Sequence, residues 1–347
     1  MQKIALNARF YSHRPTGMQR YAIELARRFG EALIPIRPKS PLRGSAGHLW
    51  EQLYLPSAVG GKLLWSPNNT GPLVVRNQVC TFHDLIPIER PEWFTRAFAA
   101  WYRVLLPQLA RKAQHLIAIS EFTRRRIIEL FHVPENKVSV VLNGVDQGFE
   151  PAAPELVQEA REALRIPTPH YLLCVGSLEP RKNTERLIRA WSIAQSTVPD
   201  DISLVIAGGS GSTLVFSGKA VTAMAPRTHL TGYVPEKYLS ALYSGAVAML
   251  YPSLYEGFGL PPLEAMACGC PVITSNTTSL PEVTGDAAVL VDPEDVDAIA
   301  AAIVRIVDNK DLRVALRTKG MQRSAQLSWD NSARQTWDIL QAQAIRA

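Results

Sequence analysis

Two glutamates, Glu256 and Glu264, stand eight positions apart in the stretch EGFGLPPLEAMACGC, which follows an apolar, strand-like segment. Glu264 falls in the predicted first turn of a helix that begins at Pro262, where proline is tolerated and an acidic side chain is stabilising. Glu256 precedes Gly257 in a loop, where no local structural requirement explains an acid. A carboxylate at that position can accept hydrogen bonds from the hydroxyl groups of a ligand.

A pair of cations, Arg181 and Lys182, follows the strand-like segment YLLCVG and precedes the helical segment TERLIRAW. Two positive charges beside a helix N-terminus suit a diphosphate, because the helix dipole and the N–H groups of the first turn also attract anions. The alternative is an exposed basic turn that binds no ligand.

Two residues in the first half of the chain occupy comparable positions. Gly17, in RPTGMQRY, stands at the entry to a helix, where the missing side chain lets a phosphate or a sugar approach the backbone. His83 comes directly after the strand-like segment QVCTF and is followed by Asp84. A histidine at a strand end can donate to a sugar hydroxyl or stabilise developing charge, although each residue alone is also explained by a turn or a cap.

Strand-like and helical segments alternate through both halves of the chain. The strands expected in the first half are KIALNARF, QVCTFHDL, HLIAIS and KVSVVLNG, and those in the second half are YLLCVGSLE, ISLVIAGG, AVAMLYPS and CPVITS. This order predicts an α/β fold of two doubly wound, Rossmann-like domains, in which ligands bind beyond the carboxyl ends of the strands. Two prolines in residues 145–157 mark the crossing between the domains.

Charge is distributed unevenly along the chain. Residues 1–145 contain 20 Lys and Arg against 9 Asp and Glu, a net charge of +11, whereas residues 146–347 contain 17 against 22, a net charge of −5. No zinc-finger or recognition-helix pattern indicates nucleic acid. The segment EFTRRRIIELF, residues 121–131, sets Arg124, Arg125 and Arg126 beside apolar side chains, which favours an anionic membrane surface. The alternative is a solvated helix packed on its own core.

Other classes of protein are excluded by what the sequence lacks. No run approaches the roughly 18 apolar residues of a membrane-spanning helix, and the start MQKIALNARF has no signal-peptide core. The four cysteines are Cys80, Cys174, Cys268 and Cys270. They have no paired CxxC spacing, so we expect reduced thiols in the cytoplasm and no disulfide framework or zinc site.

These motifs occur together and in order. The spacing in EGFGLPPLEAMACGCPV, with GSLEPRKN, FHDLIP, SEFT and NGVD, resembles the retaining glycosyltransferases of family 4, from PTGMQRY nearly to the end of the chain. The resemblance implies the GT-B fold, with an acceptor domain at 1–150 that the C-terminal helix 329–347 joins, a donor domain at 151–328, and a cleft between them. It implies hexose transfer from a nucleoside diphosphate sugar with retention, an enzyme of EC class 2.4.

The same resemblance assigns roles to individual residues. Arg181 and Lys182 are expected to stabilise the leaving diphosphate in place of a metal, so no metal and no other cofactor is expected. Glu256 is expected to hold the hexose, and His83 to hold the sugar near the reacting carbon. The residues expected to bind the donor are Gly17, Ser177, Tyr233, Val234, Gly257, Phe258, Gly259, Leu260 and Glu264.

Three of these expectations are more specific. Glu264 is expected to bind the ribose, and Tyr233 and Val234 to lie against the base. Many family members have an arginine where this chain has Ser177, which leaves more of the phosphate charge to the cations at 181 and 182. The DxD at Asp295 to Asp297 lies in DPEDVDAIAAAI, which is typical of a helix start and not of a metal site.

The substrate follows from a finer similarity. FHDLIPIERPEWF and GSLEPRKN resemble bacterial mannosyltransferases of O-antigen and exopolysaccharide assembly. This similarity favours GDP-mannose, a lipid-linked or oligosaccharide acceptor, and a peripheral position on the inner face of the cytoplasmic membrane. The alternatives are a UDP-glucose-type donor, a non-catalytic nucleotide-sugar-binding protein, and an NAD-dependent oxidoreductase, whose best fingerprint, GGSGSTL, lacks the final glycine.

Overall fold

The computed structural model describes residues 3–12, 16–42, 44–177, 179–209 and 224–345. The chain divides into two compact units, of which the first contains residues up to 91, residues 96–144 and residues from 328 onward, and the second contains 92–95 and 145–327. The first unit thus ends at Gly144 and not at residue 150. Val145 already belongs to the second unit, where its N–H donates to the carbonyl of Leu327 at 3.0 Å.

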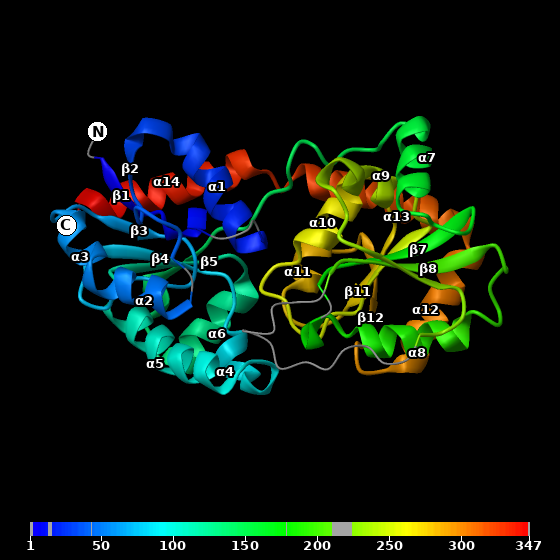
Figure 1. The fold of residues 1–347 in the computed structure, drawn as a ribbon, viewed down its shortest axis with the longest axis horizontal. Helices are drawn as coiled ribbons and strands as arrows, with labels where there is room; N and C mark the ends of the chain where they lie inside the picture. Colours follow the sequence, from blue (N-terminus) through cyan, green and yellow to red (C-terminus); the bar gives the residue numbers. More distant parts are fainter. Residues whose placement is uncertain (1–2, 13–15, 43, 178, 210–223, 346–347) are drawn as a thin grey trace. The chain divides into compact units, whose positions relative to one another are not determined.

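The first unit contains a six-stranded parallel sheet in the order β2-β1-β3-β4-β5-β6, with helices on both faces (Figure 1). Its strands are β1 (Ile4–Asn7), β2 (Leu33–Ile36), β3 (Leu64–Ser66), β4 (Gln78–Phe82), β5 (His115–Ala118) and β6 (Val138–Val140). Its helices are α1 (Gly17–Phe29), α2 (Gly44–Leu53), α3 (Leu55–Val59), α4 (Ile86–Glu89), α5 (Arg96–Lys112), α6 (Glu121–Phe131) and α14 (Trp329–Ile345). Strands β4 and β5 are buried along their whole length, as expected for parallel strands that helices cover on both faces.

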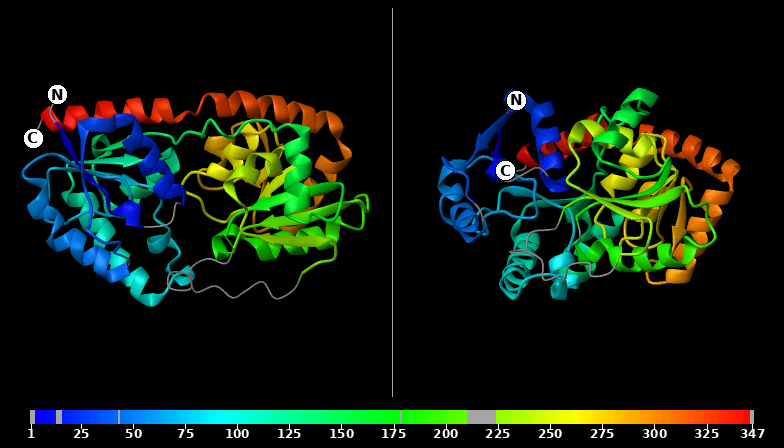
Figure 2. Two further views of the ribbon diagram at one scale, coloured as in Figure 1. Left: turned by 45° about the horizontal axis from the view of Figure 1, so that its top comes forward. Right: turned by 45° about the vertical axis from the view of Figure 1, so that its right-hand side comes forward.

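The last helix of the chain, α14, lies along α1 in the first unit (Figure 2). Its first residue, Trp329, is buried with its ring 6.1 Å from that of Tyr21. Farther along, the carbonyl of Gln343 accepts a hydrogen bond from Gln114 Nε2 at 2.9 Å. The C-terminal segment therefore contributes to the core of the unit that the N-terminal segment begins.

The second unit contains another six-stranded parallel sheet, in the order β12-β11-β10-β7-β8-β9. Its strands are β7 (His170–Val175), β8 (Ile202–Ala207), β9 (Thr228–Gly232), β10 (Ala248–Tyr251), β11 (Val272–Ser275) and β12 (Ala288–Val291). Its helices are α7 (Pro154–Ala163), α8 (Thr184–Ala194), α9 (Leu239–Ser244), α10 (Leu260–Ala267), α11 (Leu280–Thr284), α12 (Val296–Asp308) and α13 (Lys310–Ala325). Its main core lies between the sheet and helices α8 and α12.

The doubly wound α/β prediction is confirmed, and all eight predicted strands are present. Four further strands, β2, β3, β9 and β12, were not predicted. Strands β2, β9 and β12 lie at sheet edges and are partly exposed. Strand β3 is buried but has only three residues, too few to show a period.

The segment 121–131, whose arginines favoured a membrane surface, forms helix α6, and part of its apolar face lies in the core. Its apolar residues Ile127 and Phe131 are buried in the core of the first unit. Arg124 pairs with Glu121 at 2.9 Å and with Glu135 at 3.2 Å. Arg126 pairs with two further glutamates. The helix therefore packs on its own core, and two of its three arginines are neutralised within the protein.

Three other expectations from the sequence bear on this description. The four cysteines are all buried and free, as predicted for reduced thiols. None of the helices in the described ranges has the length and apolar character needed to cross a membrane. Most of the rejected dinucleotide fingerprint GGSGSTL lies outside the described residues, which omit 210–223.

Candidate functional site

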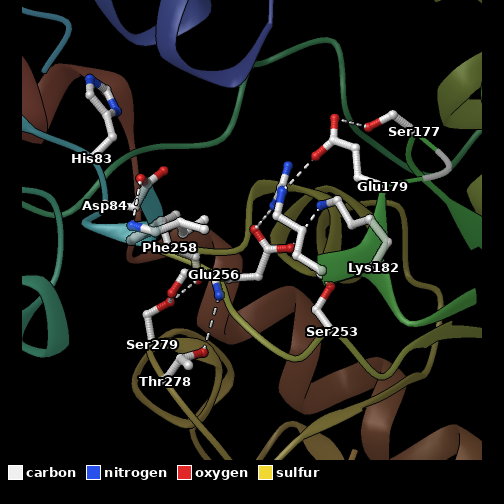
Figure 3. A network of polar contacts seen from close by, with 12 residues as sticks. His83, Asp84, Ser177, Glu179, Lys182, Ser253, Glu256, Phe258, Thr278 and Ser279 are labelled. Carbon is white, nitrogen blue, oxygen red and sulfur yellow. Dashed lines mark hydrogen bonds and ion pairs between the residues drawn. The ribbon is translucent and has the colours of Figure 1, made fainter. Parts of the chain in front are cut away.

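The carboxylate of Glu256 is the centre of a buried polar network in the second unit (Figure 3). Its Oε1 atom accepts hydrogen bonds from Lys182 Nζ at 2.8 Å, Tyr251 OH at 2.9 Å and Ser253 Oγ at 2.9 Å. Its Oε2 atom accepts one, from Arg181 Nη1 at 2.7 Å. The glutamate and the pair of cations, predicted separately from two distant motifs, therefore lie in direct contact.

The two carboxylate oxygens of Glu256 differ in what they can still accept. A carboxylate offers about four lone-pair sites, two on each oxygen. Oε1 already has three donors, so it is saturated, whereas Oε2 has only the Arg181 guanidinium. One further hydrogen bond at Oε2 is therefore available to a ligand hydroxyl without displacing a protein group.

Electrostatics keep this glutamate ionised. Burial acts to raise the pKa of Glu256, but the charges of Arg181 and Lys182 and the hydrogen bonds from Lys182 and Tyr251 outweigh burial and lower it to about 2. Burial and the neighbouring guanidinium lower the pKa of Lys182, against the pull of the carboxylate. Glu256 is consequently a fixed anion at neutral pH and not a proton donor.

A second acid balances the cations. Glu179 accepts from Arg181 Nε at 2.7 Å and from the hydroxyl of Ser177. Two cations and two carboxylates thus form a compact group that is neutral overall. Ser177, predicted to bind the donor, is held by Glu179 in this structure, and no signal in the sequence pointed to that acid.

The turn that carries the cations is fixed by an asparagine. Residues Pro180–Lys182 form a single helical turn, and Asn183 follows in the left-handed region with φ of 59°. Its side-chain Nδ2 donates to the carbonyls of Pro252 at 2.9 Å and Pro293 at 2.6 Å. Asn183 therefore joins the turn after β7 to the loop after β10, which is what brings the cations to Glu256.

The loop from Glu256 to the start of α10 is held by a serine. Ser279 Oγ contacts the carbonyl of Glu256 at 2.9 Å and that of Phe258 at 2.8 Å (Figure 3). Gly259 precedes the helix with φ of 116°, and a Cβ atom there would lie 2.8 Å from Leu280. Glycine is required at this position because both the backbone angle and the packing exclude a side chain.

The prediction that Glu264 lies in the first turn of its helix is wrong. Helix α10 begins at Leu260, because Pro261 and Pro262 both fit into a first turn, where no internal N–H bond is needed. Glu264 therefore lies beyond that turn, so stabilisation by the helix dipole does not explain an acidic residue at this position. It is buried and accepts from Tyr243 OH at 3.1 Å.

Tyr233 and Val234, the residues predicted to lie against the base, follow a strand that the sequence did not predict. Tyr233 and Val234 come directly after β9, and they differ in exposure: Tyr233 is 80% exposed, whereas Val234 is 8% exposed. An exposed ring beyond a strand end is available to a planar ligand. Gly208, after β8, was not predicted, yet a Cβ atom there would lie 2.0 Å from the carbonyl oxygen of Gly176 after β7.

His83 and Gly17 belong to the first unit, at the end of β4 and the start of α1. His83 is buried, its Nε2 lies 2.7 Å from the carbonyl of Pro67, and burial lowers its pKa to about 4. The ring is therefore neutral at pH 7, and it donates through Nε2. Tyr21, in the second turn of α1, lies edge-on to the His83 ring at 4.9 Å, which places the start of α1 beside β4.

The DxD segment is a helix start, as predicted. Asp295 is the N-cap of α12, and its carboxylate accepts from the N–H of Ala298 at 2.9 Å. In the part of the chain that the structure describes, no three His, Cys, Asp or Glu side chains are grouped so that they could hold a metal ion.

The network predicts a pH-dependent contribution to stability. The pKa of Glu256 falls from an ordinary 4.5 to about 2 on folding, so its contribution is complete above pH 4.5 and is lost as the pH falls towards 2. We expect Glu256→Gln to lower the free energy of unfolding by about 3 kcal/mol at pH 7, and this difference to shrink below pH 4.5. Urea unfolding of both proteins between pH 3 and pH 7 measures this difference in the free energy of unfolding.

The matched control for that measurement is Glu294→Gln, an exposed glutamate of the same unit, which is expected to change the free energy of unfolding by less than about 0.5 kcal/mol. If the difference in free energy of unfolding between wild type and Glu256→Gln stays constant or grows towards low pH, the lowered pKa of Glu256 is contradicted.

Comparison with known proteins agrees with this geometry. Residues 157–323 match the family model described as glycosyl transferases group 1, and residues 70–149 match that of glycosyltransferase family 4. The chain is 33% identical over 276 residues to the O-antigen chain mannosyltransferase B of Escherichia coli, covering 78% of this chain and 71% of that protein. It is 31% identical to the serotype-specific mannosyltransferase WbdA of E. coli, covering 74% of this chain but only 32% of that longer protein.

Among solved structures, Anabaena HepE in complex with UDP and glucose superposes with a TM-score of 0.75, covering 99% of this chain and all of that one at 16% identity. That likeness shows a common fold. Together with the matched motifs, it establishes that the chain belongs to glycosyltransferase family 4 and has the GT-B fold.

Proposed function

We propose that this glycosyltransferase transfers mannose from GDP-mannose, with retention of the anomeric configuration and without a metal ion, to an oligosaccharide or lipid-linked acceptor of cell-surface polysaccharide synthesis. The observation that carries the proposal is the buried group of Arg181, Lys182 and Glu256 at the carboxyl edge of the second sheet. The mannosyltransferase relatives support the choice of sugar.

The two cations suit the diphosphate of the donor. As the glycosidic bond breaks, negative charge develops on the departing diphosphate, and preorganised positive groups stabilise that charge more than they stabilise the ground state. Arg181 keeps 21% of its side chain exposed, so its guanidinium can contact a ligand while Glu256 and Glu179 hold it in place. A guanidinium and an ammonium supply the charge that a divalent ion supplies in metal-dependent enzymes, which supports a metal-independent reaction with no other cofactor.

Glu256 suits the hexose. Its pKa of about 2 makes it a poor general acid, so its contribution is to accept hydrogen bonds from sugar hydroxyls. The lone pair left on Oε2 gives one such bond. In the proposal the amides of Gly257, Phe258, Gly259 and Leu260 contact the same sugar and its phosphate, since Ser279 fixes the loop that carries them.

The other predicted residues complete this assignment. Glu264 accepts from the ribose hydroxyls, and Tyr233 and Val234 contact the base. Gly17 lets the donor approach the backbone at the start of α1, and neutral His83 stabilises the sugar near its reacting carbon. Ser177, which replaces the arginine common in the family, leaves the phosphate charge to Arg181 and Lys182.

A GDP-mannose donor predicts a specific pattern of ligand stabilisation. A ligand present at about 100 times its Kd adds about 2.7 kcal/mol to the free energy of unfolding. We expect GDP-mannose to raise the Tm by several degrees more than UDP-glucose does at equal concentration, in a thermal-shift panel without added metal. Stabilisation by UDP-glucose alone refutes the choice of donor and leaves the fold untouched. The product anomer, determined by NMR with GDP-α-mannose, is expected to be α.

The cationic pair predicts the phenotype of a second variant. Lys182→Met keeps the length of the side chain and removes one charge from the diphosphate site, so kcat/KM is expected to fall roughly 10²- to 10³-fold. Lys319→Ala, an exposed lysine of the same unit that pairs with Asp286, is the control and should be fully active. Wild-type turnover by a folded Lys182→Met enzyme, or loss of wild-type activity in a chelator, overturns the proposed mechanism.

A lipid-linked acceptor implies contact with a membrane surface, and the +11 charge of residues 1–145 supports that. We expect co-sedimentation with phosphatidylglycerol vesicles at low salt, weaker binding at high salt, and little with phosphatidylcholine. Because Arg124 and Arg126 are paired, the double variant Arg124→Gln, Arg126→Gln should bind within about twofold of wild type. Equal binding to neutral and anionic vesicles rules out the electrostatic contact.

A further inference from the structure

The first unit contains a second buried carboxylate, which the proposed mechanism does not use. Glu51 of α2 is completely buried, and its Oε1 atom accepts hydrogen bonds from Asn7 Nδ2 at 2.6 Å and Thr70 Oγ1 at 2.9 Å. Its Oε2 atom has no hydrogen bond within the described ranges, and lies 3.8 Å from Arg9 Nη2 and 3.7 Å from His48 Nδ1. The Oε1 atom is therefore fixed by two hydrogen bonds, whereas Oε2 lies near Arg9 and His48 at distances too long for a hydrogen bond.

This glutamate is ionised, and its main effect is to hold the arginine. Burial acts to raise the pKa of Glu51, but the charge of Arg9 and the polar groups of His48 and Asn7 outweigh burial and lower it. A buried ion pair contributes little net stability, because desolvation offsets the attraction. A buried anion at this position is therefore better explained by the guanidinium that it positions.

Arg9 is held loosely and can be reached by a ligand. Thr70 is the only described residue to which its guanidinium donates, at 3.4 Å, whereas Arg181 of the second unit makes two bonds of 2.7 Å. Its side chain is 12% exposed, in contrast to the fully buried Glu51. Most of the five N–H groups of the guanidinium therefore have no acceptor among the described residues.

The sequence keeps room for this arginine. A Cβ atom at Gly47 would lie 2.8 Å from Arg9 Nη1, so any side chain there would displace the guanidinium. Gly47 lies inside helix α2, where glycine costs about 0.5–1 kcal/mol relative to alanine. The helix thus accepts a less stable residue where the arginine needs the space.

The group lies at the ligand-binding edge of the first sheet. Asn7 is the last residue of β1, and Thr70 follows the end of β3. The neighbour of Thr70, Asn69, accepts from the N–H of His83 at 2.5 Å and donates to the carbonyl of Asp84 at 3.1 Å. Arg9 is therefore linked, through two adjacent loop residues, to the histidine that the proposed mechanism places at the sugar.

We propose that Arg9, positioned by Glu51, binds hydroxyl oxygens of a neutral sugar residue of the acceptor. The inference rests on the proposed function, in which the first unit binds the acceptor. Arg9 is the single arginine beside Glu51, whereas the proposed diphosphate site has two adjacent cations, so the Arg9 group suits a neutral, hydroxyl-bearing ligand better than a diphosphate. The guanidinium presents its donors in a planar fork, which matches two adjacent sugar hydroxyls.

The test separates binding of the acceptor from binding of the donor. With an α-linked mannobiose as soluble acceptor, Arg9→Ala is expected to raise the acceptor KM, and the Kd from NMR titration, roughly 10- to 100-fold. The affinity for GDP-mannose should stay within about twofold. Glu51→Gln keeps the shape of the side chain and should weaken mannobiose binding in the same direction. Arg27→Ala, an exposed arginine of the same unit, is the control.

Three results overturn the inference: unchanged mannobiose affinity in Arg9→Ala, an equal loss of donor and acceptor affinity, or competition by inorganic pyrophosphate that Arg9→Ala abolishes. If Glu51→Gln folds poorly, Arg9→Lys replaces it as the second variant, because lysine keeps the positive charge but lacks the planar pair of N–H donors of the guanidinium. Mannobiose binding is measured without transfer. A protein that binds mannobiose through Arg9 but transfers no mannose therefore contradicts the proposed function and supports this inference.

Discussion

The buried contact of Glu256 with Arg181 and Lys182 is the interaction on which the second unit depends for its chemistry. Two like charges placed next to each other in a protein interior are unfavourable, and the carboxylate between them offsets that repulsion and favours the charged form of both. The Oε2 atom of the same carboxylate accepts a hydrogen bond only from Arg181 and can accept one more. In the proposed function, one side chain therefore performs both charge compensation and ligand recognition, so changing it affects both.

That contact exists because three loops at one edge of the sheet are tied together. Asn183 bonds two carbonyls from other loops, and Ser279 bonds two carbonyls of the loop that carries Glu256. The short helical turn before Asn183 points the two cations towards β10. Small polar side chains that touch no substrate in the proposal thus set the geometry of those that do.

The first unit also pairs a buried glutamate with an arginine, but the two side chains lie farther apart. Glu51 is even more deeply buried than Glu256, yet its carboxylate lies 3.8 Å from Arg9, whereas Glu256 accepts a 2.7 Å hydrogen bond from Arg181. A tightly bonded cation suits the donor, because its diphosphate is stabilised by positive charge that is already positioned before the donor binds. A loosely held guanidinium suits an acceptor hydroxyl, because little has to be broken when the ligand arrives.

The sequence by itself determined the two doubly wound sheets, the eight strands with clear apolar runs, and the residues Arg181, Lys182, Glu256 and His83 at strand ends. It could do so because buried parallel strands read as apolar segments and because ligands bind where those strands end. Only the tertiary structure decided that Glu256 is the counterion of the two cations, that Glu264 lies past the first turn of α10, and that Arg124 and Arg126 of α6 are paired. The counterion contact joins residues 74 and 75 positions apart, and the pair of Arg126 with Glu89 joins residues 37 positions apart, so the spacing of residues along one segment carries no information about them. The start of α10 is a local feature, where two adjacent prolines allow more than one first residue.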